Sequence, residues 1–176
     1  SINWLKAGKI LAHPTESIWG LGCDALNETA INLIFKLKKR PLNKNLILLV
    51  DSFFSIEDFV MNLSADQEKL INEKWPGPHT FLFTYNKYLP NHLMNETGKI
   101  AIRVSNHLPI KALMKGYKGL MVSTSANLSG QSNINCPSKI LETFANDDIA
   151  YYDESLGDQS KPSQIIDLET GAIIRE

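Results

Sequence analysis

Cysteines and long apolar runs are scarce in this chain, and their scarcity excludes several classes of protein. Only Cys23 and Cys136 occur, far apart and without a CxxC pair, which argues against a disulfide framework and a zinc site. The longest aliphatic run, Leu46–Val50, is five residues long, whereas a membrane-spanning helix needs about 20. The first residues lack the pattern of a signal peptide. We therefore expect a protein of the reducing cytoplasm that has no membrane segment.

The chain also lacks an excess of either positive or negative charge. Lys plus Arg is 18 and Asp plus Glu is 19, so the formal net charge is −1. This balance excludes a whole-protein field that attracts nucleic acid, and it excludes a disordered acidic chain. The 176 residues are 43% hydrophobic, which is enough for a real core in a chain of this length. We expect one domain spanning residues 1–176.

Helical and strand patterns alternate along the chain. Strand patterns cover Lys9–Ala12, Leu46–Val50, Thr80–Tyr85, Ile100–Val104, Leu120–Ser123, Ile149–Tyr152, Gln164–Leu168 and Ala172–Arg175. Helices are predicted from Asn27 to about Lys39, from the capping box at Ser64 towards Trp75, over Pro109–Lys115, and from Pro137 to about Phe144. Some neighbouring strands have no helix between them, which favours a mixed sheet. The predicted fold class is α/β with a twisted open mixed sheet and flanking helices.

Two polar stretches follow predicted strands and could carry chemistry. Pro14-Thr-Glu-Ser-Ile-Trp-Gly-Leu-Gly22 could form a substrate wall at a strand end, but an ordinary strand-to-helix turn fits the same residue types. Ser123-Thr-Ser-Ala-Asn-Leu-Ser-Gly130 offers hydroxyls with little bulk, which suits recognition of phosphate or an amino acid, although a polar surface loop fits equally well. Neither stretch decides between its two interpretations alone.

Cations are placed where an anion could bind. Lys36–Lys44 contains five cations and no acid, and it could bind a polyphosphate or could be a solvated helix end. Arg103 lies within a strand pattern, so it needs a carboxylate or phosphate partner if it points inward, and Arg175 raises the same question. By contrast, Trp75–Thr80 contains two prolines and a glycine, and we interpret it as a rigid structural bend.

The common fingerprints of nucleotide and hydrolase sites are missing. The chain has no GxxxxGK(S/T) loop, no GxGxxG after a strand and no GxSxG elbow. Its four histidines do not have the spacing of metal ligands, and we predict no metal site. If the protein binds ATP, it does so through another arrangement.

Taken in order, these stretches resemble the YrdC-like threonylcarbamoyl-AMP synthases, in their short single-domain bacterial form. The resemblance rests on six motifs: Pro14–Gly22, Lys38–Pro41, Trp75–Pro78, Ile102–Val104, Ser123–Gly130 and Pro162–Asp167. It implies a twisted sheet around a basic concave cleft. It also implies the reaction of L-threonine, bicarbonate (or CO2) and ATP to threonylcarbamoyl-AMP and pyrophosphate. The product would serve the threonylcarbamoyl modification of adenosine 37 in tRNA.

The resemblance assigns site residues by position. Threonine-side contacts would come from Thr15, Arg103, Ser123 and Ser163, with Arg103 as the clamp on the carboxylate. ATP-side contacts would come from Arg40, Lys44, Lys99, Ser125, Asn127, Asn133 and Arg175. Lys38 and Arg40 would stabilise charge, and no residue is assigned as a nucleophile. Mg2+ would arrive with the ATP phosphates. Companion proteins would transfer the threonylcarbamoyl group, which leaves direct contact with tRNA open.

The sequence departs from the family at two positions, and a different class of function competes with the enzyme. Ser17 stands where a second threonine is common, and Leu49 stands where many longer members have a histidine, so a polar contact is lost or replaced there. The alternative function is a non-catalytic RNA-binding module that uses a basic cleft. An inward Arg103 beside small hydroxyls favours the amino-acid pocket over an RNA surface.

Overall fold

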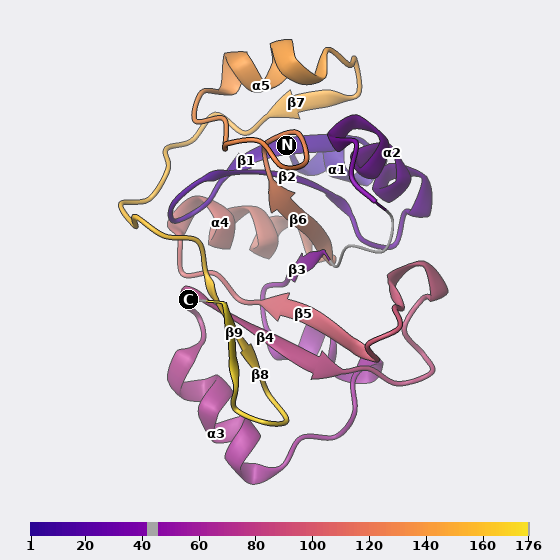
Figure 1. Cartoon of the computed structure of the whole chain (residues 1–176), viewed down its shortest axis with the longest axis vertical. Helices are drawn as coiled ribbons and strands as arrows, with labels where there is room; N and C mark the ends of the chain where they lie inside the picture. Colours follow the sequence, from indigo (N-terminus) through magenta and orange to yellow (C-terminus); the bar gives the residue numbers. More distant parts are fainter. Residues whose placement is uncertain (42–45, 176) are drawn as a thin grey trace.

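The computed structural model describes residues 1–41 and 46–175, and these residues form a nine-stranded mixed sheet in the order β7-β1-β2-β6-β3-β5-β4-β8-β9 (Figure 1). The strands are β1 (Ile10–Pro14), β2 (Trp19–Asp24), β3 (Ile47–Leu49), β4 (His79–Thr84), β5 (Lys99–Arg103), β6 (Met121–Ser125), β7 (Ile149–Tyr151), β8 (Gln164–Asp167) and β9 (Ile173–Arg175). The mixed α/β fold predicted from the sequence is confirmed. β4 and β5, which no helix separates, pair antiparallel, with Phe83 opposite Ile100.

Local sequence signals set the ends of several helices. The helices are α1 (Ile2–Lys6), α2 (Glu28–Lys38), α3 (Ala65–Lys74), α4 (Leu108–Tyr117) and α5 (Pro137–Phe144), and short 3-10 turns cover Phe53–Ser55, Glu57–Phe59 and Asn91–Leu93. Asn27 caps α2, since its Oδ1 accepts a hydrogen bond from the Ala30 amide at 3.0 Å. The predicted capping box at Ser64 and Gln67 opens α3 with both of its hydrogen bonds present. None of the helices in the described part of the chain is long and apolar enough to cross a membrane.

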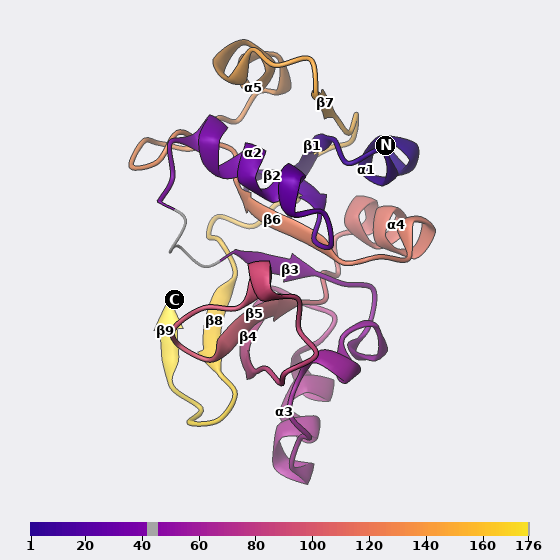
Figure 2. The same cartoon turned by 90° about the vertical axis from the view of Figure 1, so that its right-hand side faces the viewer.

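The two faces of the sheet are covered unequally. One face packs the larger core, to which α2, α3 and α5 contribute residues such as Ile34, Ile71 and Ile140. On the other face, α1 and α4 lie side by side (Figure 2) and pack around a smaller cluster that contains Leu11 and Met121. Because these two helices are short, they cover only part of that face. The uncovered part holds a group of polar side chains that includes Arg103, Ser123 and Ser125.

One of the two interpretations left open for Pro14–Gly22 is wrong. The stretch is not a strand-to-helix turn, because its second half is strand β2, which forms a tight hairpin with β1. The turn itself closes at Thr15, whose amide and hydroxyl both donate to the Ile18 carbonyl at 3.1 and 2.7 Å. The glycines hid the strand in the sequence, because Gly20 and Gly22 occupy every second position of it and glycine is uncommon within strands. Helix α1 was also missed.

Candidate active site

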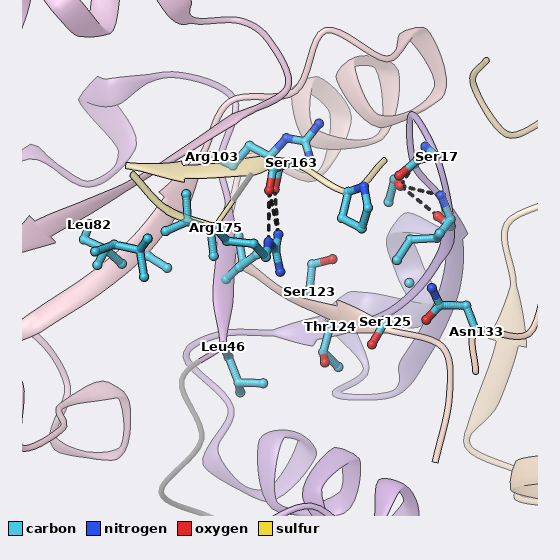
Figure 3. A pocket seen from close by; sticks show the side chains of 18 of the residues that line it. Ser17, Leu46, Leu82, Arg103, Ser123, Thr124, Ser125, Asn133, Ser163 and Arg175 are labelled. Carbon is cyan, nitrogen blue, oxygen red and sulfur yellow. Dashed lines mark hydrogen bonds between the residues drawn. The ribbon is translucent and has the colours of Figure 1, made fainter. Parts of the chain in front are cut away.

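The open part of the sheet face holds a pocket of about 440 Å3, which lies within the usual size range of small-molecule sites. Strands β2, β3, β4, β5, β6, β8 and β9 contribute to its walls (Figure 3). The pocket brings together residues predicted for both substrates. Those lining it are Thr15, Arg103, Ser123 and Ser163 of the threonine set, and Arg40, Ser125, Asn133 and Arg175 of the ATP set.

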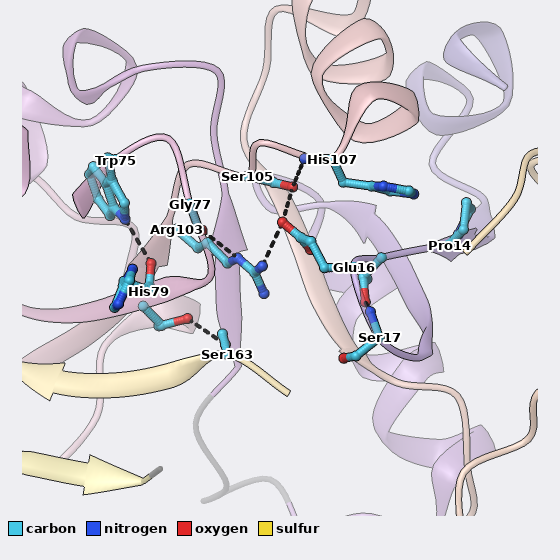
Figure 4. Close-up of polar contacts among 12 residues, drawn as sticks. Pro14, Glu16, Ser17, Trp75, Gly77, His79, Arg103, Ser105, His107 and Ser163 are labelled. Carbon is cyan, nitrogen blue, oxygen red and sulfur yellow. Dashed lines mark hydrogen bonds and ion pairs between the residues drawn. The ribbon is translucent and has the colours of Figure 1, made fainter. Parts of the chain in front are cut away.

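Arg103 reaches the pocket from the end of β5 and is held by a buried carboxylate. Its Nη2 lies 2.6 Å from Glu16 Oε1, an ion pair rather than an aligned hydrogen bond, and its Nε donates to the Gly77 carbonyl at 3.3 Å (Figure 4). Ser105 donates to the same Glu16 oxygen at 2.7 Å. Burial lowers the pKa of Arg103, and Glu16 opposes that shift. The inward arginine therefore has the carboxylate partner that its position requires.

The role of Glu16 was missed in the sequence, although the residue lies inside the first motif. Glu16 is 5% exposed, and its partner Arg103 is 87 positions away along the chain. The signal available was an acid directly after a buried strand, where solvation of the charge is poor. The predicted bend at Trp75–Thr80 also contributes here, because its Gly77 carbonyl accepts from Arg103. Trp75 packs against Phe81 with ring centroids 5.4 Å apart, which anchors the bend on β4.

Ser163 and Arg175 form the wall contributed by β8 and β9. Arg175 donates from Nε and Nη2 to the Ser163 carbonyl at 3.1 and 2.7 Å, and from Nη2 to its hydroxyl at 3.2 Å (Figure 3). The Ser163 hydroxyl also lies 2.9 Å from the Thr80 hydroxyl. Burial lowers the pKa of Arg175. This wall presents a cation whose position is fixed by the main chain of its neighbour.

On the other side of the pocket, Lys38 lies beneath the loop that follows β6. Its ammonium donates to the Ser125 carbonyl, to the Asn127 carbonyl at 2.7 Å and to Asn127 Oδ1 at 3.2 Å. Ser125 Oγ donates to the same Asn127 oxygen at 2.6 Å. Burial, and secondarily the charge of Arg40, lowers the pKa of Lys38 to about 8. Lys38 and Asn127 thus support the loop, while Ser125 lines the pocket.

Among the other predicted residues that the structure describes, Lys38, Asn127 and Lys99 are not part of the pocket lining. Lys99 points to β8, where its Nζ lies 2.7 Å from Asp167 and 2.9 Å from Glu169. The assignment of Lys99 to ATP depended on spacing in a variable region of the family. The two ion pairs instead indicate that Lys99 stabilises the end of β8 and the turn after it. Lys44 lies outside the described residues. Leu49 is buried in the cluster formed with α1 and α4. Arg40 lines the pocket, and burial lowers its pKa.

Comparisons with known proteins give consistent matches over the whole chain. The Sua5_yciO_yrdC family model, described as "Telomere recombination", matches residues 3–176. A protein of Saccharophagus degradans named threonylcarbamoyl-AMP synthase is 37% identical over 174 residues, which cover 99% of this chain and 91% of that protein.

Solved structures extend the comparison to the fold. The crystal structure of P. abyssi Sua5 complexed with L-threonine matches with a TM-score of 0.84 at 26% identity, over 98% of this chain and 51% of that one. This chain therefore spans about half the length of that Sua5. The structure of E. coli YciO matches with a TM-score of 0.83 at 24% identity, over 99% of this chain and 86% of that one. At that identity, the likeness to YciO concerns the fold alone.

Proposed function

Since the chain belongs to the Sua5/YciO/YrdC family, we propose that it is a threonylcarbamoyl-AMP synthase that consumes L-threonine, bicarbonate or CO2, and ATP. The observation that carries this proposal is the shared pocket: Arg103 and Ser123 of the threonine set and Arg40 and Ser125 of the ATP set line one cavity. An amino acid and a nucleotide bound there would meet. The 37% identical relative of nearly the same length carries the name of this enzyme.

The chemistry requires an anion to approach another anion. The threonine nitrogen forms a bond to the carbon of CO2 and loses a proton, which gives a carbamate. A carbamate oxygen then bonds to the α-phosphorus of ATP, while the bond from that phosphorus to the bridging oxygen breaks and pyrophosphate leaves. Cations on both sides of the reacting centre lower this barrier by offsetting the charge. Arg103, Arg40 and Arg175 line the pocket as such cations.

We propose these tasks for the residues from the family resemblance, and the pocket that they share supports the proposal. The guanidinium of Arg103 binds the threonine carboxylate beside its ion pair with Glu16, with Thr15, Ser123 and Ser163 as the other amino-acid contacts. Arg40, Ser125, Asn133 and Arg175 bind the nucleotide, which brings its own Mg2+. Lys38 and Asn127 hold the loop that carries Ser125. Lys99 is left out of this assignment because of its ion pairs with Asp167 and Glu169.

The proposal extends to the cellular context. Residues 1–176 act as one domain in the cytoplasm, and the product passes to companion proteins that place the threonylcarbamoyl group on adenosine 37 of tRNA. Threonylcarbamoyl-AMP is a mixed anhydride of a carbamic acid and a phosphate, so a partner has to take it up before water does.

Pyrophosphate release tests the function directly. Purified protein with ATP and Mg2+ should release pyrophosphate only when L-threonine and bicarbonate are both present. Omission of either should reduce release to the level without enzyme. The matched variant is Arg103→Ala, which should weaken the use of threonine far more than the binding of ATP, because loss of a charged hydrogen-bond partner costs about 1.5–3 kcal/mol. Release that is equal without threonine would contradict the synthase, and RNA binding without any release would favour the non-catalytic alternative.

A further inference from the structure

The imidazole of His13 crosses a whole strand to reach the pocket. His13 lies on β1, and its side chain is fully buried. Its neighbour across the first ladder is Gly20 on β2, and β2 in turn pairs with β6, where Gly22 lies opposite Ser123. The ring passes over β2 at the two glycines, and its Nε2 lies 3.2 Å from the Ser123 hydroxyl.

The two glycines of β2 make room for this ring. A Cβ atom added at Gly20 would lie 2.7 and 2.8 Å from His13 Cε1 and Nε2, and one added at Gly22 would lie 3.2 Å from Cδ2. A side chain at Gly20 would therefore displace the imidazole, whereas one at Gly22 would meet the Val122 carbonyl oxygen first, at 2.8 Å, and would crowd the ring. The absence of side chains at Gly20 and Gly22 thus lets the imidazole lie over β2 and reach the Ser123 hydroxyl on β6.

The hydrogen bonds of the ring determine which nitrogen carries the proton. Nδ1 lies 3.3 Å from the Pro14 carbonyl, and a carbonyl oxygen can only accept, so Nδ1 is the donor. Burial lowers the pKa of His13 to about 4, opposed by Glu16 and assisted by His107 and Arg103. The imidazole is consequently neutral near pH 7, and Nε2 carries a lone pair. The Ser123 hydroxyl has to donate its hydrogen to that lone pair.

We propose that His13 is a positioning residue that fixes the Ser123 hydroxyl as a hydrogen-bond acceptor towards the pocket. The ligand group that faces Ser123 is then an N–H or O–H donor, and a carboxylate is disfavoured there. For an amino-acid ligand this separates the two ends of the molecule: the carboxylate goes to Arg103, and the amino or hydroxyl group goes to Ser123. The identity of this ligand as threonine rests on the proposed function.

Two substitutions that differ only in reach test the positioning role. The amide of His13→Gln extends about as far as Nε2, whereas that of His13→Asn extends only to the place of Nδ1. His13→Asn should raise the KM for threonine roughly threefold to tenfold, as expected for loss of one hydrogen bond, with the KM for ATP unchanged. His13→Gln should recover most of that loss. In a Ser123→Ala background, His13→Asn should have no further effect on the threonine KM.

The contrary outcomes are equally specific. Equal losses in His13→Asn and His13→Gln, or an undiminished effect of His13→Asn in the Ser123→Ala background, would overturn the role, because a ring that merely fills space does not act through Ser123. Thermal unfolding of each variant identifies any that fail to fold, and a measurement on the wild-type protein tests the role if His13→Asn does fail.

Nitrogen chemical shifts of the imidazole test the tautomer without any ligand. A 15N-labelled wild-type protein should show the proton on Nδ1 and an unprotonated Nε2 near pH 7. A proton on Nε2 would overturn the positioning role alone. Wild-type protein that neither binds threonine nor turns it over would instead overturn the proposed function and, with it, the ligand named here. The two failures are therefore distinguishable.

Discussion

The two sides of the pocket are each supported by a buried cation, but the cations work in opposite ways. On the side that we propose for the nucleotide, Lys38 is 1% exposed and directs its ammonium to oxygens of the loop at Ser125 and Asn127. On the side that we propose for the amino acid, Arg103 is 7% exposed, pairs with Glu16 and still lines the pocket. Lys38 therefore contacts only protein oxygens among the contacts described, whereas Arg103 contacts protein and also lines the space where a ligand would bind.

The difference follows from the shapes of the two groups. An ammonium has three donors, and in Lys38 its three acceptors are main-chain and amide oxygens that hold one loop. A guanidinium has five donors in a planar fork, so Arg103 can contact Gly77 and Glu16 and keep donors for a carboxylate. The N–H groups that a buried cation does not use within the protein therefore decide its role. A cation with such groups left over can bind a ligand, and one without them supports the protein.

Replacement of Lys38 should give the largest effect on stability. Lys38→Met would leave three acceptors beneath the loop without their donor, at a cost of roughly 3 kcal/mol or more in the free energy of unfolding. The loop carrying Ser125 should loosen, and the KM for ATP should rise more than that for threonine. Urea unfolding and steady-state kinetics measure both.

The matched control is Lys36→Met on the same helix, since Lys36 is exposed. It should change the free energy of unfolding by less than about 0.5 kcal/mol. If Lys38→Met is as stable as Lys36→Met, the loop does not depend on this ammonium.

Acid should act on the amino-acid side through His13. Its pKa is about 4 in the folded protein and 6.5 as the reference value, so between these pH values the unfolded state binds a proton that the folded state does not. Stability then rises with pH, and it is lost as the pH falls below 6.5, by about 2 kcal/mol at pH 5. His13→Gln lacks this titration, so its unfolding free energy should fall less between pH 7 and 5 by about that amount.

Urea unfolding of both proteins at pH 7, 6 and 5 gives the comparison. Other groups titrate in both proteins, so only the difference between the two curves reports on His13. Glu16, Arg103 and His107 are the charged or titratable groups that act on the ring. Parallel curves would mean that His13 is protonated as readily when folded as when unfolded.

The contrast between the two sides also shows where the sequence was sufficient. Local signals located the capping box at Ser64, the helix start at Pro137 and the strands that became β4 and β5, because these depend on neighbours within a few positions. The polar stretches after predicted strands were noticed in the same way, but the choice of individual pocket residues came from the family resemblance.

The contacts that hold the pocket residues in place could not be predicted from local signals. Glu16 and Arg103 are 87 positions apart, Lys38 and Ser125 are also 87 apart, and His13 and Ser123 are 110 apart. Contacts at such separations leave no periodicity in the chain. Their residue types were noticed, but pairing them needed the fold, and the prediction that Lys38 stabilises charge did not foresee that its donors go to a loop.

A smaller, selective effect is expected when Arg103 keeps its charge but loses its fork. Lys at this position cannot serve both Glu16 and a bound carboxylate, so Arg103→Lys should raise the KM for threonine roughly tenfold, which is about 1.4 kcal/mol. The KM for ATP should stay within about twofold, because Arg103 belongs to the other side. Steady-state pyrophosphate release measures both constants. An equal rise in the two would show that the sides are not separable.

Replacement of Lys99 should give the smallest effect on stability and none on the KM for ATP. This result would show that, of the three cations compared, only the two buried ones support the pocket. Its ammonium lies 2.7 Å from Asp167 and 2.9 Å from Glu169, and its side chain is 20% exposed. Lys99→Met should lower the free energy of unfolding by about 1 kcal/mol or less, as for ion pairs in contact with solvent. The KM for ATP should not change, since Lys99 is outside the pocket lining. A clear rise in that KM with unchanged stability would return Lys99 to the nucleotide side, where the family resemblance first placed it.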